Sequence, residues 1–166
     1  MTKAIYIIVF TVLIAGHNNA YSQSVTIKES IDSINAMLKV NPYVDRFNEI
    51  SFYYSIDITS EKELVVEMNF DGPFKWLYKT KISDLDLTPK KDACRESPSS
   101  LCWICKKADS TKVNSCVIAE MVYTDGGSQK ENSSSICVSF SGQGIICNDL
   151  NSKFHLLFTS VMNESQ

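Results

Sequence analysis

The spacing of apolar residues first predicts a helix near the start of the chain. Four apolar residues follow spacings of four, three and four positions, which places them on one helical face: Ile27, Ile31, Ile34 and Leu38. Thr26 and Glu29 have the spacing of a capping box, in which two side chains satisfy free backbone amides at a helix start. Pro42 disfavours helical geometry at the residue before it. The pattern therefore predicts an amphipathic helix over residues 26–40.

The period then changes to two, because apolar and polar residues alternate through the next three segments. Polar residues 59–62 separate the first two segments, and Asp71-Gly72-Pro73 supplies turn chemistry before the third. Alternating segments joined by short turns are typical of an antiparallel meander. The predicted strands are 50–58, 64–70 and 74–82.

The following part of the chain is less regular. Residues 83–100 are mostly polar and contain two prolines, which indicates a loop. Residues 124–127 have the composition of a turn. Around that turn, short strands are predicted over 101–107, 116–123 and 136–140.

A second amphipathic helix is predicted at the C-terminal end. Five apolar residues share one helical face: Leu150, Phe154, Leu157, Phe158 and Val161. Cys147 joins this face if the helix begins early enough. Asn148-Asp149 suits the helix start, because side-chain oxygens and negative charge are stabilising there.

Together these elements predict an α+β fold. We expect mainly antiparallel β-sheet, or a small barrel of about six strands, with an N-terminal and a C-terminal amphipathic helix. In the barrel, the last helix would plug one open end. A cystatin-like sheet wrapped on the first helix is the alternative. No repeat or linker divides the chain, so a single globular domain is expected over residues 23–166.

The first 22 residues place this domain outside the cytoplasm. Lys3 provides a positive start, and residues 4–16 form an almost unbroken apolar run. Small residues, Ala20 and Ser22, precede a cleavage point before Gln23, so residues 1–22 are predicted to be a signal peptide. The run is shorter than the roughly 20 residues that cross a bilayer. We therefore expect a secreted or periplasmic protein without a stable membrane anchor.

The charge of the chain excludes some classes of partner. Removal of Lys3 with the leader leaves 15 of the 16 basic residues against 19 acidic ones, a net charge of −4. A mildly acidic chain with scattered lysines has no electrostatic footprint for nucleic acid. Anionic membranes are excluded as targets for the same reason.

The six cysteines are predicted to form structural disulfides. Residues 23–93 contain none, and all six follow: Cys94, Cys102, Cys105, Cys116, Cys137 and Cys147. An even number in an exported chain favours disulfides, but six cysteines allow 15 pairings and the sequence does not choose among them.

Cys102 and Cys105 also form a C-x-x-C motif, which can serve as a redox pair. The residues between them are bulky and apolar, and no βαβ pattern surrounds them. On a strand, a spacing of three points the two sulfurs to opposite faces, so we expect them to have different partners. Zinc binding by Cys94, Cys102, Cys105 and Cys116 is weakly indicated, because a second C-x-x-C is missing.

The sequence predicts no catalytic, cofactor-binding or metal-binding residue. His155 is the only histidine after the leader, and its place among helical residues predicts a partly exposed side chain. No serine lies in a Gly-x-Ser-x-Gly motif. Asp84 and Asp86 lack the pattern of a calcium loop.

Aromatic residues on the predicted strands allow two interpretations. Six of them alternate along the meander: Phe52, Tyr54, Phe70, Phe74, Trp76 and Tyr78. They could line a cavity for an apolar ligand, but aromatic residues on the inner faces of strands more often belong to the core. We therefore expect core positions.

A resemblance to known proteins rests on three parts of the chain: residues 70–74, residues 82–86 and the terminal helix. They read Phe70-Asp71-Gly72-Pro73-Phe74 and Ile82-Ser83-Asp84-Leu85-Asp86. On these segments the chain resembles small exported bacterial proteins of unassigned function, and its element order resembles a pleckstrin-homology-like barrel. The resemblance covers about residues 25–162 and implies no catalytic residue. The six cysteines exceed what that architecture requires.

These observations predict a non-catalytic exported binding or interaction module. Its partner would be a protein or small ligand outside the cytoplasm, unidentified by the sequence. Two alternatives remain: a thiol-disulfide oxidoreductase using Cys102 and Cys105, and a carrier of a small apolar ligand.

Overall fold

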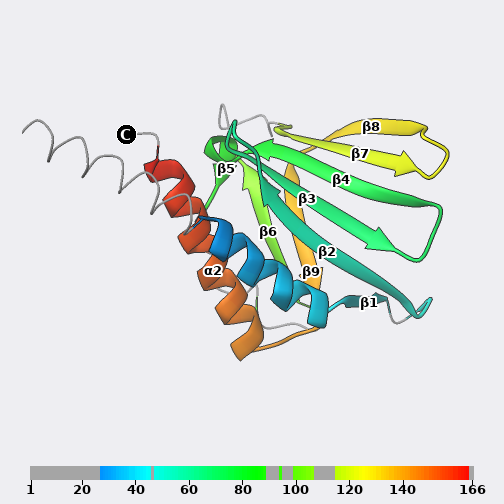
Figure 1. Cartoon of the computed structure of the whole chain (residues 1–166), viewed down its shortest axis with the longest axis horizontal. Coiled ribbons are helices and arrows are strands. Elements are labelled where there is room, and N and C mark those ends of the chain that lie inside the picture. The colour runs from blue at the N-terminus through cyan, green and yellow to red at the C-terminus, as the bar shows by residue number, and fades with distance from the viewer. Residues whose placement is uncertain (1–26, 46, 89–93, 95–98, 107–114, 165–166) are drawn as a thin grey trace, which may run out of the picture.

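The computed structural model describes residues 27–45, 47–88, 94, 99–106 and 115–164. The predicted leader and Thr26 of the predicted capping box lie outside these ranges. The first helix occupies residues 27–40, and the C-terminal helix α2 spans Ile145–Asn163. Both helices lie on one side of the molecule, and the β-structure extends away from them (Figure 1).

Six strands form the larger sheet, in the order β1-β2-β3-β4-β7-β8, with all neighbours antiparallel. Their bounds are β1 Tyr43–Asp45, β2 Ile50–Ile58, β3 Glu63–Phe70, β4 Phe74–Lys81, β7 Val117–Tyr123 and β8 Ser128–Ser133. The three-stranded meander predicted from the alternating pattern is thus confirmed as β2, β3 and β4.

A smaller sheet has the order β5-β6-β9 and is also antiparallel. It comprises β5 Leu85–Asp86, β6 Ser99–Cys105 and β9 Ser135–Phe140, and the 3-10 turn η1 Ile82–Asp84 leads into it. The α+β class with two helices is confirmed. The barrel alternative is not formed, because β1 and β8 each pair on one side only and leave the larger sheet open.

One core joins the two sheets and the helices. It contains Ile34 and Leu38 of the first helix, apolar residues of both sheets and one face of α2. Trp103 of β6 packs against Phe154 and Phe158 of α2, with ring centroids 4.8 and 5.2 Å away. The predicted face of α2 is therefore buried, whereas that of the first helix is buried at Ile34 and Leu38 and half-buried at Ile27 and Ile31.

The start of α2 differs from the prediction. The helix begins at Ile145, after Gly144 with a φ of 54°, a conformation that glycine adopts at little cost. The Asn148 amide already donates to the Gly144 carbonyl, so Asn148 lies within the first turn instead of capping it. The early start places Cys147 on the buried face.

The first helix also completes the edge of the larger sheet. β1 pairs only with residues 50–52 of β2, so the remainder of that edge lacks a partner strand. Asn35 takes this place: its Oδ1 accepts from the Ile56 amide at 2.8 Å, and its Nδ2 donates to the Ile56 carbonyl at 2.9 Å. A side chain thus replaces a strand where buried backbone groups need partners.

Candidate functional site

The larger sheet has two ends that differ in how they are covered. The end near the helices carries the core residues of β2, β3 and β7. At the opposite end lie the β1–β2, β3–β4 and β7–β8 turns (Figure 1). The β3–β4 and β7–β8 turns are far from the helices, whereas the β1–β2 turn is closer, because the first helix leads directly into β1. We call this opposite end of the sheet the distal end.

Five aromatic side chains, one from each of five neighbouring strands, form a row at the distal end. We call this row the aromatic ladder: Tyr43, Phe52, Phe70, Phe74 and Tyr123. Strand register places Tyr43 opposite Phe52, and Phe52 opposite Phe70. It likewise places Phe74 opposite Tyr123. The row shares a face with the core residues, because alternate side chains of a strand point to the same side.

The rings of the ladder contact one another in sequence. Successive ring centroids are 5.7, 5.4, 4.7 and 6.1 Å apart, within the range of aromatic pairs. The angles between successive ring planes are 37°, 47°, 73° and 61°. The first two pairs are tilted and the last two are edge-to-face, so the row forms a corrugated apolar surface instead of a flat one.

The prediction of core positions for the aromatic series is confirmed for two residues and is wrong for the three that belong to the ladder. All six predicted aromatic residues are half-buried. Tyr54 and Tyr78 pack against the core, whereas Phe52, Phe70 and Phe74 lie outside it. The reason is that the larger sheet extends beyond the smaller sheet and the helices that cover its other end (Figure 1).

The β3–β4 turn fixes the middle of the ladder. A Cβ atom on Gly72 would lie 2.0 Å from Cε2 of Phe70, so only glycine lets this ring pack against the turn. The Thr124 amide donates to the Pro73 carbonyl at 3.0 Å and ties this turn to β7. Beside Phe70, Phe74 and Tyr123 lies a shallow hollow of about 180 Å³.

Phe47 is an exposed aromatic residue in one of the turns of the distal end. It lies in the β1–β2 turn, two residues after β1, and is 96% exposed. Exposed aromatic side chains of this kind are enriched at binding surfaces. Sequence analysis did not single out Phe47, Tyr43 or Tyr123. Each lies outside the alternating meander from which the aromatic series was taken.

Two tyrosines lie between the ladder and the core, on the face of the sheet that both share, and their hydroxyls resist ionisation. Burial raises the pKa of Tyr54 to about 12, although a hydrogen bond with the Ser139 side chain partly opposes this. Burial, followed by the nearby carboxylate of Glu131, raises the pKa of Tyr78. This part of the face is therefore poorly hydrated and adjoins negative charge.

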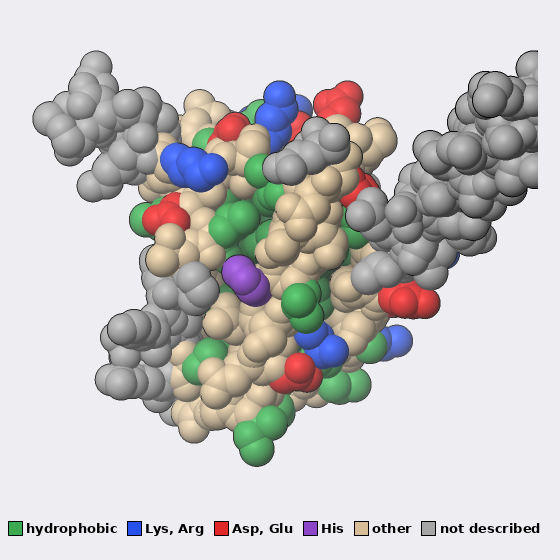
Figure 2. Space-filling view, turned by 90° about the vertical axis from the view of Figure 1, so that its left-hand side faces the viewer, with side chains coloured by type: hydrophobic (Ala, Val, Ile, Leu, Met, Phe, Trp, Pro, Cys, Tyr) green, Lys and Arg blue, Asp and Glu red, His purple; other side chains and the backbone are tan. Residues whose placement is uncertain are grey.

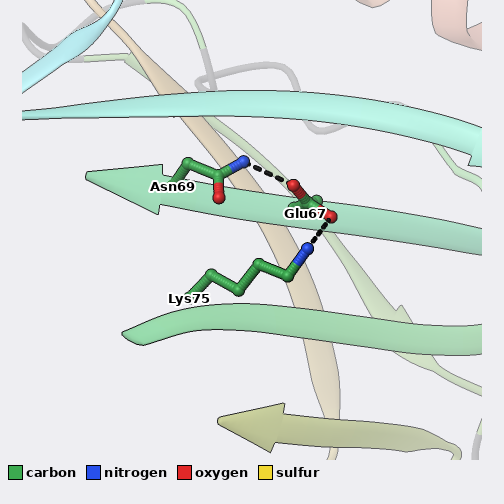
Figure 3. Close-up of polar contacts among 3 residues, drawn as sticks. All are labelled: Glu67, Asn69 and Lys75. Carbon is green, nitrogen blue, oxygen red and sulfur yellow. Dashed lines mark hydrogen bonds and ion pairs between the residues drawn. The ribbon is translucent and has the colours of Figure 1, made fainter. Parts of the chain in front are cut away.

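The opposite face of the same sheet mixes polar side chains with exposed apolar ones, Tyr53 and Ile118. Glu67 lies between Asn69 and Lys75, which donate to it at 2.6 and 2.9 Å (Figure 3). Partial burial alone would raise the pKa of Glu67, but these two hydrogen bonds and the lysine charge outweigh it and lower the pKa. Lys75 is thus held in an ion pair with Glu67.

The cysteines form three disulfides: Cys94–Cys147, Cys102–Cys137 and Cys105–Cys116. The prediction that all six form bridges is confirmed, as is the prediction that Cys102 and Cys105 have different partners. Disulfides indicate an oxidising environment.

The redox and zinc interpretations of the cysteines do not match this geometry. The two sulfurs of the C-x-x-C motif belong to separate bridges, Cys102 with Cys137 and Cys105 with Cys116. The four cysteines of the zinc interpretation are divided among all three disulfides. Within the described ranges, no three His, Cys, Asp or Glu side chains converge as a metal site would require.

The helix side of the molecule carries exposed apolar residues of its own, among them Ile145 and Leu156 of α2. Its charged side chains, of both signs, lie scattered among apolar and polar ones (Figure 2). His155 lies on α2 and is exposed, as the sequence predicts. Asp86 accepts hydrogen bonds from Thr88, a local turn contact. A second hollow, of about 190 Å³, lies beside Lys62, whose ammonium donates to the Val161 carbonyl at the end of α2.

Comparison with known proteins gives no match to a family model, a curated protein or a solved structure. Among the helices that the described residues form, none is long and apolar enough to cross a membrane.

Proposed function

We propose that this protein is an exported, non-catalytic binding module that recognises another polypeptide through the aromatic ladder. The observation that supports this most directly is the ladder itself. Five contacting rings lie half-buried on the uncovered end of a sheet, and Phe47 is exposed in the β1–β2 turn at the same end. Apolar surface left partly exposed by a folded chain is typical of interaction sites.

The ring geometry favours a polypeptide over ligands that stack on flat surfaces. Nucleobases need parallel stacking platforms and positive charge. The ladder's planes differ by 37° to 73°, and the chain is acidic. Corrugated aromatic surfaces instead accept the interdigitating side chains of a protein interface.

Export is part of the proposal. The predicted signal peptide and the three disulfides both support a location outside the cytoplasm. The carrier alternative gains no support from the hollow beside the ladder, whose volume of about 180 Å³ is smaller than the roughly 300–1,000 Å³ of small-molecule sites.

Site-specific photo-cross-linking tests the proposed function. A photoreactive phenylalanine analogue is placed at Phe47 and, in a matched control, at the 63% exposed Leu156 of α2. Both variants are incubated with the extracellular fluid of the source organism. We expect defined cross-linked polypeptides from position 47 only, and their loss when Phe52→Ser is added. Identical products from both positions would contradict the proposal.

A further inference from the structure

The disulfide between Cys102 and Cys137 differs from the other two in its place on the fold. Cys102 of β6 and Cys137 of β9 lie directly opposite each other in the smaller sheet, so the bridge joins two neighbouring strands. We call it the cross-strand disulfide. Successive residues of a strand point to opposite faces, and Trp103, next to Cys102, packs against α2. The cross-strand disulfide therefore lies on the face of the smaller sheet that is turned away from α2.

This face of the smaller sheet is partly open to solvent. Cys102 and Cys137 are both half-buried, and Ile104 on the same face is 39% exposed. Each of the other two bridges has one buried cysteine, because Cys147 is 0% and Cys105 is 4% exposed. A reductant can therefore approach the cross-strand disulfide from the side of either cysteine.

Thiol–disulfide exchange also depends on the sulfur that leaves, because it departs as a thiolate. Apolar surroundings disfavour the thiolate form of a cysteine. Attack on Cys94 would release Cys147 into the core, and attack on Cys116 would release Cys105 there. Attack on either sulfur of the cross-strand disulfide instead releases a thiolate at a half-buried position, where water can solvate it.

The bridge between Cys105 and Cys116 is also enclosed by protein groups. The hydroxyl of Thr80 donates to the Cys116 Sγ at 3.6 Å, and Thr80 itself is 3% exposed. The Cys116 amide donates to the Cys105 Sγ at 2.9 Å. These contacts limit the approach of a reductant to this bridge.

Reduction of the cross-strand disulfide would leave β6 and β9 paired. The two strands share six antiparallel residue pairs, of which the two cysteines form one. The α2 side of these strands, with Leu101 and Val138, belongs to the core. Backbone pairing and burial therefore hold the two thiols opposite each other after reduction, so the same bridge can form again.

We propose that the cross-strand disulfide is a site of reversible thiol–disulfide exchange with a dithiol reductant. This site differs from the C-x-x-C interpretation, because the cysteine that exchanges together with Cys102 is Cys137 and not Cys105. The protein is the substrate of this exchange and not its catalyst.

The exchange consists of two successive displacements. One thiol of the reductant loses its proton to water and attacks one sulfur of the bridge, the S–S bond breaks, and the other cysteine leaves as a thiolate that takes a proton from water. The second thiol of the reductant then loses its proton and displaces the first cysteine from the mixed disulfide, and this cysteine is protonated in turn. Two electrons and two protons thus pass to Cys102 and Cys137, and the reductant becomes a disulfide.

Differential alkylation tests this inference with the complete mature protein. The folded protein is incubated with dithiothreitol, samples are alkylated with N-ethylmaleimide at intervals, and mass spectrometry of peptides measures each cysteine separately. We expect Cys102 and Cys137 to be reduced at least about tenfold faster than the other four cysteines. We also expect their bridge to form again when oxidised glutathione replaces dithiothreitol. In denaturing urea, which exposes all six cysteines, the difference in rate should disappear.

Two matched double substitutions assign the fast step. Cys102→Ser/Cys137→Ser should remove the fast step and leave the reduction of the other two bridges slow. Cys105→Ser/Cys116→Ser, which removes one of the enclosed bridges, should leave the fast step unchanged. The measurement on the unchanged protein decides the inference even where a variant fails to fold.

Three results would overturn the inference. Simultaneous labelling of all six cysteines would show that reduction requires unfolding. Faster reduction of either other bridge would show that exposure and the leaving thiolate do not govern the exchange. Re-formation of disulfides with other pairings would show that the strands do not hold the two thiols together. Because none of these results involves the aromatic ladder, this inference and the proposed function can fail independently.

Discussion

At the residue scale, a single side chain can bond to backbone groups that have no partner strand, and Asn35 is the clearest case. Both of its amide atoms bond to the backbone of Ile56. Asn35→Ala would leave a partly buried amide and carbonyl without partners, so we expect a loss of about 1–3 kcal/mol in the free energy of unfolding. Urea denaturation measures this. Asp32→Ala, at an exposed position of the same helix, is the control and should change stability by less than about 0.5 kcal/mol.

Gly72 is required by packing at the middle of the ladder. We expect Gly72→Ala to displace the Phe70 ring and to lower the free energy of unfolding by about 1–3 kcal/mol, because a Cβ there would overlap the ring. Gly127→Ala in the neighbouring turn is a matched control, since its Cβ would lie 3.3 Å from an Asp125 oxygen. Equal effects of the two substitutions would show that the contact with Phe70 is unimportant.

Tyr54 is expected to make stability depend on alkaline pH. Its folded pKa, about 12, lies above its unfolded value of about 10, so the unfolded chain loses this proton first. The stabilisation is therefore complete below pH 10 and is lost as pH rises toward 12, with a loss of about 1 kcal/mol at pH 11. The stability difference between the unchanged protein and Tyr54→Phe should thus shrink between pH 9 and pH 11. A difference independent of pH would contradict this.

At the scale of elements, strongly periodic segments were predictable and short or polar ones were not. The first helix, the meander and the buried face of α2 follow directly from spacings of 3.6 and two. β8 was missed because its residues, Ser128–Ser133, are polar and mostly exposed, so no alternation marks them. β1 and β5 have three and two residues, too few to show a period.

The disulfide Cys94–Cys147 is expected to hold the N-terminal end of α2 against the rest of the fold. Its cysteines are 53 residues apart, whereas Cys105 and Cys116 are separated by 11. Loop entropy predicts about 4 kcal/mol of stabilisation for the first and about 3 kcal/mol for the second. Replacing each pair with alanine and measuring the free energy of unfolding compares them. A larger loss for the Cys105/Cys116 pair would show that loop length does not govern these bridges.

At the scale of the whole molecule, the candidate site depends on how the strands pair with one another, which no single segment of the sequence shows. Phe52, Phe70 and Phe74 were noticed along the sequence, but their alignment with Tyr43 and Tyr123 is a property of strand register. Register depends on every strand pairing of the sheet. The extent of the smaller sheet, which ends before it reaches the ladder and so leaves it uncovered, also depends on strand pairing. The pairing of the cysteines was open for the same reason.

The covalent links of the molecule are distributed unevenly, and this has a consequence for its motions. All three disulfides join segments of the C-terminal half, whereas β1 to β4 contain no cysteine. Opening of those strands meets no covalent restraint within them, so their amides should exchange with deuterium sooner than those of β6 and β9. Mass spectrometry of peptic fragments would measure the difference. If the ladder binds as proposed, its members on β1 to β4 are the ones free of covalent restraint, and their positions could adjust on contact.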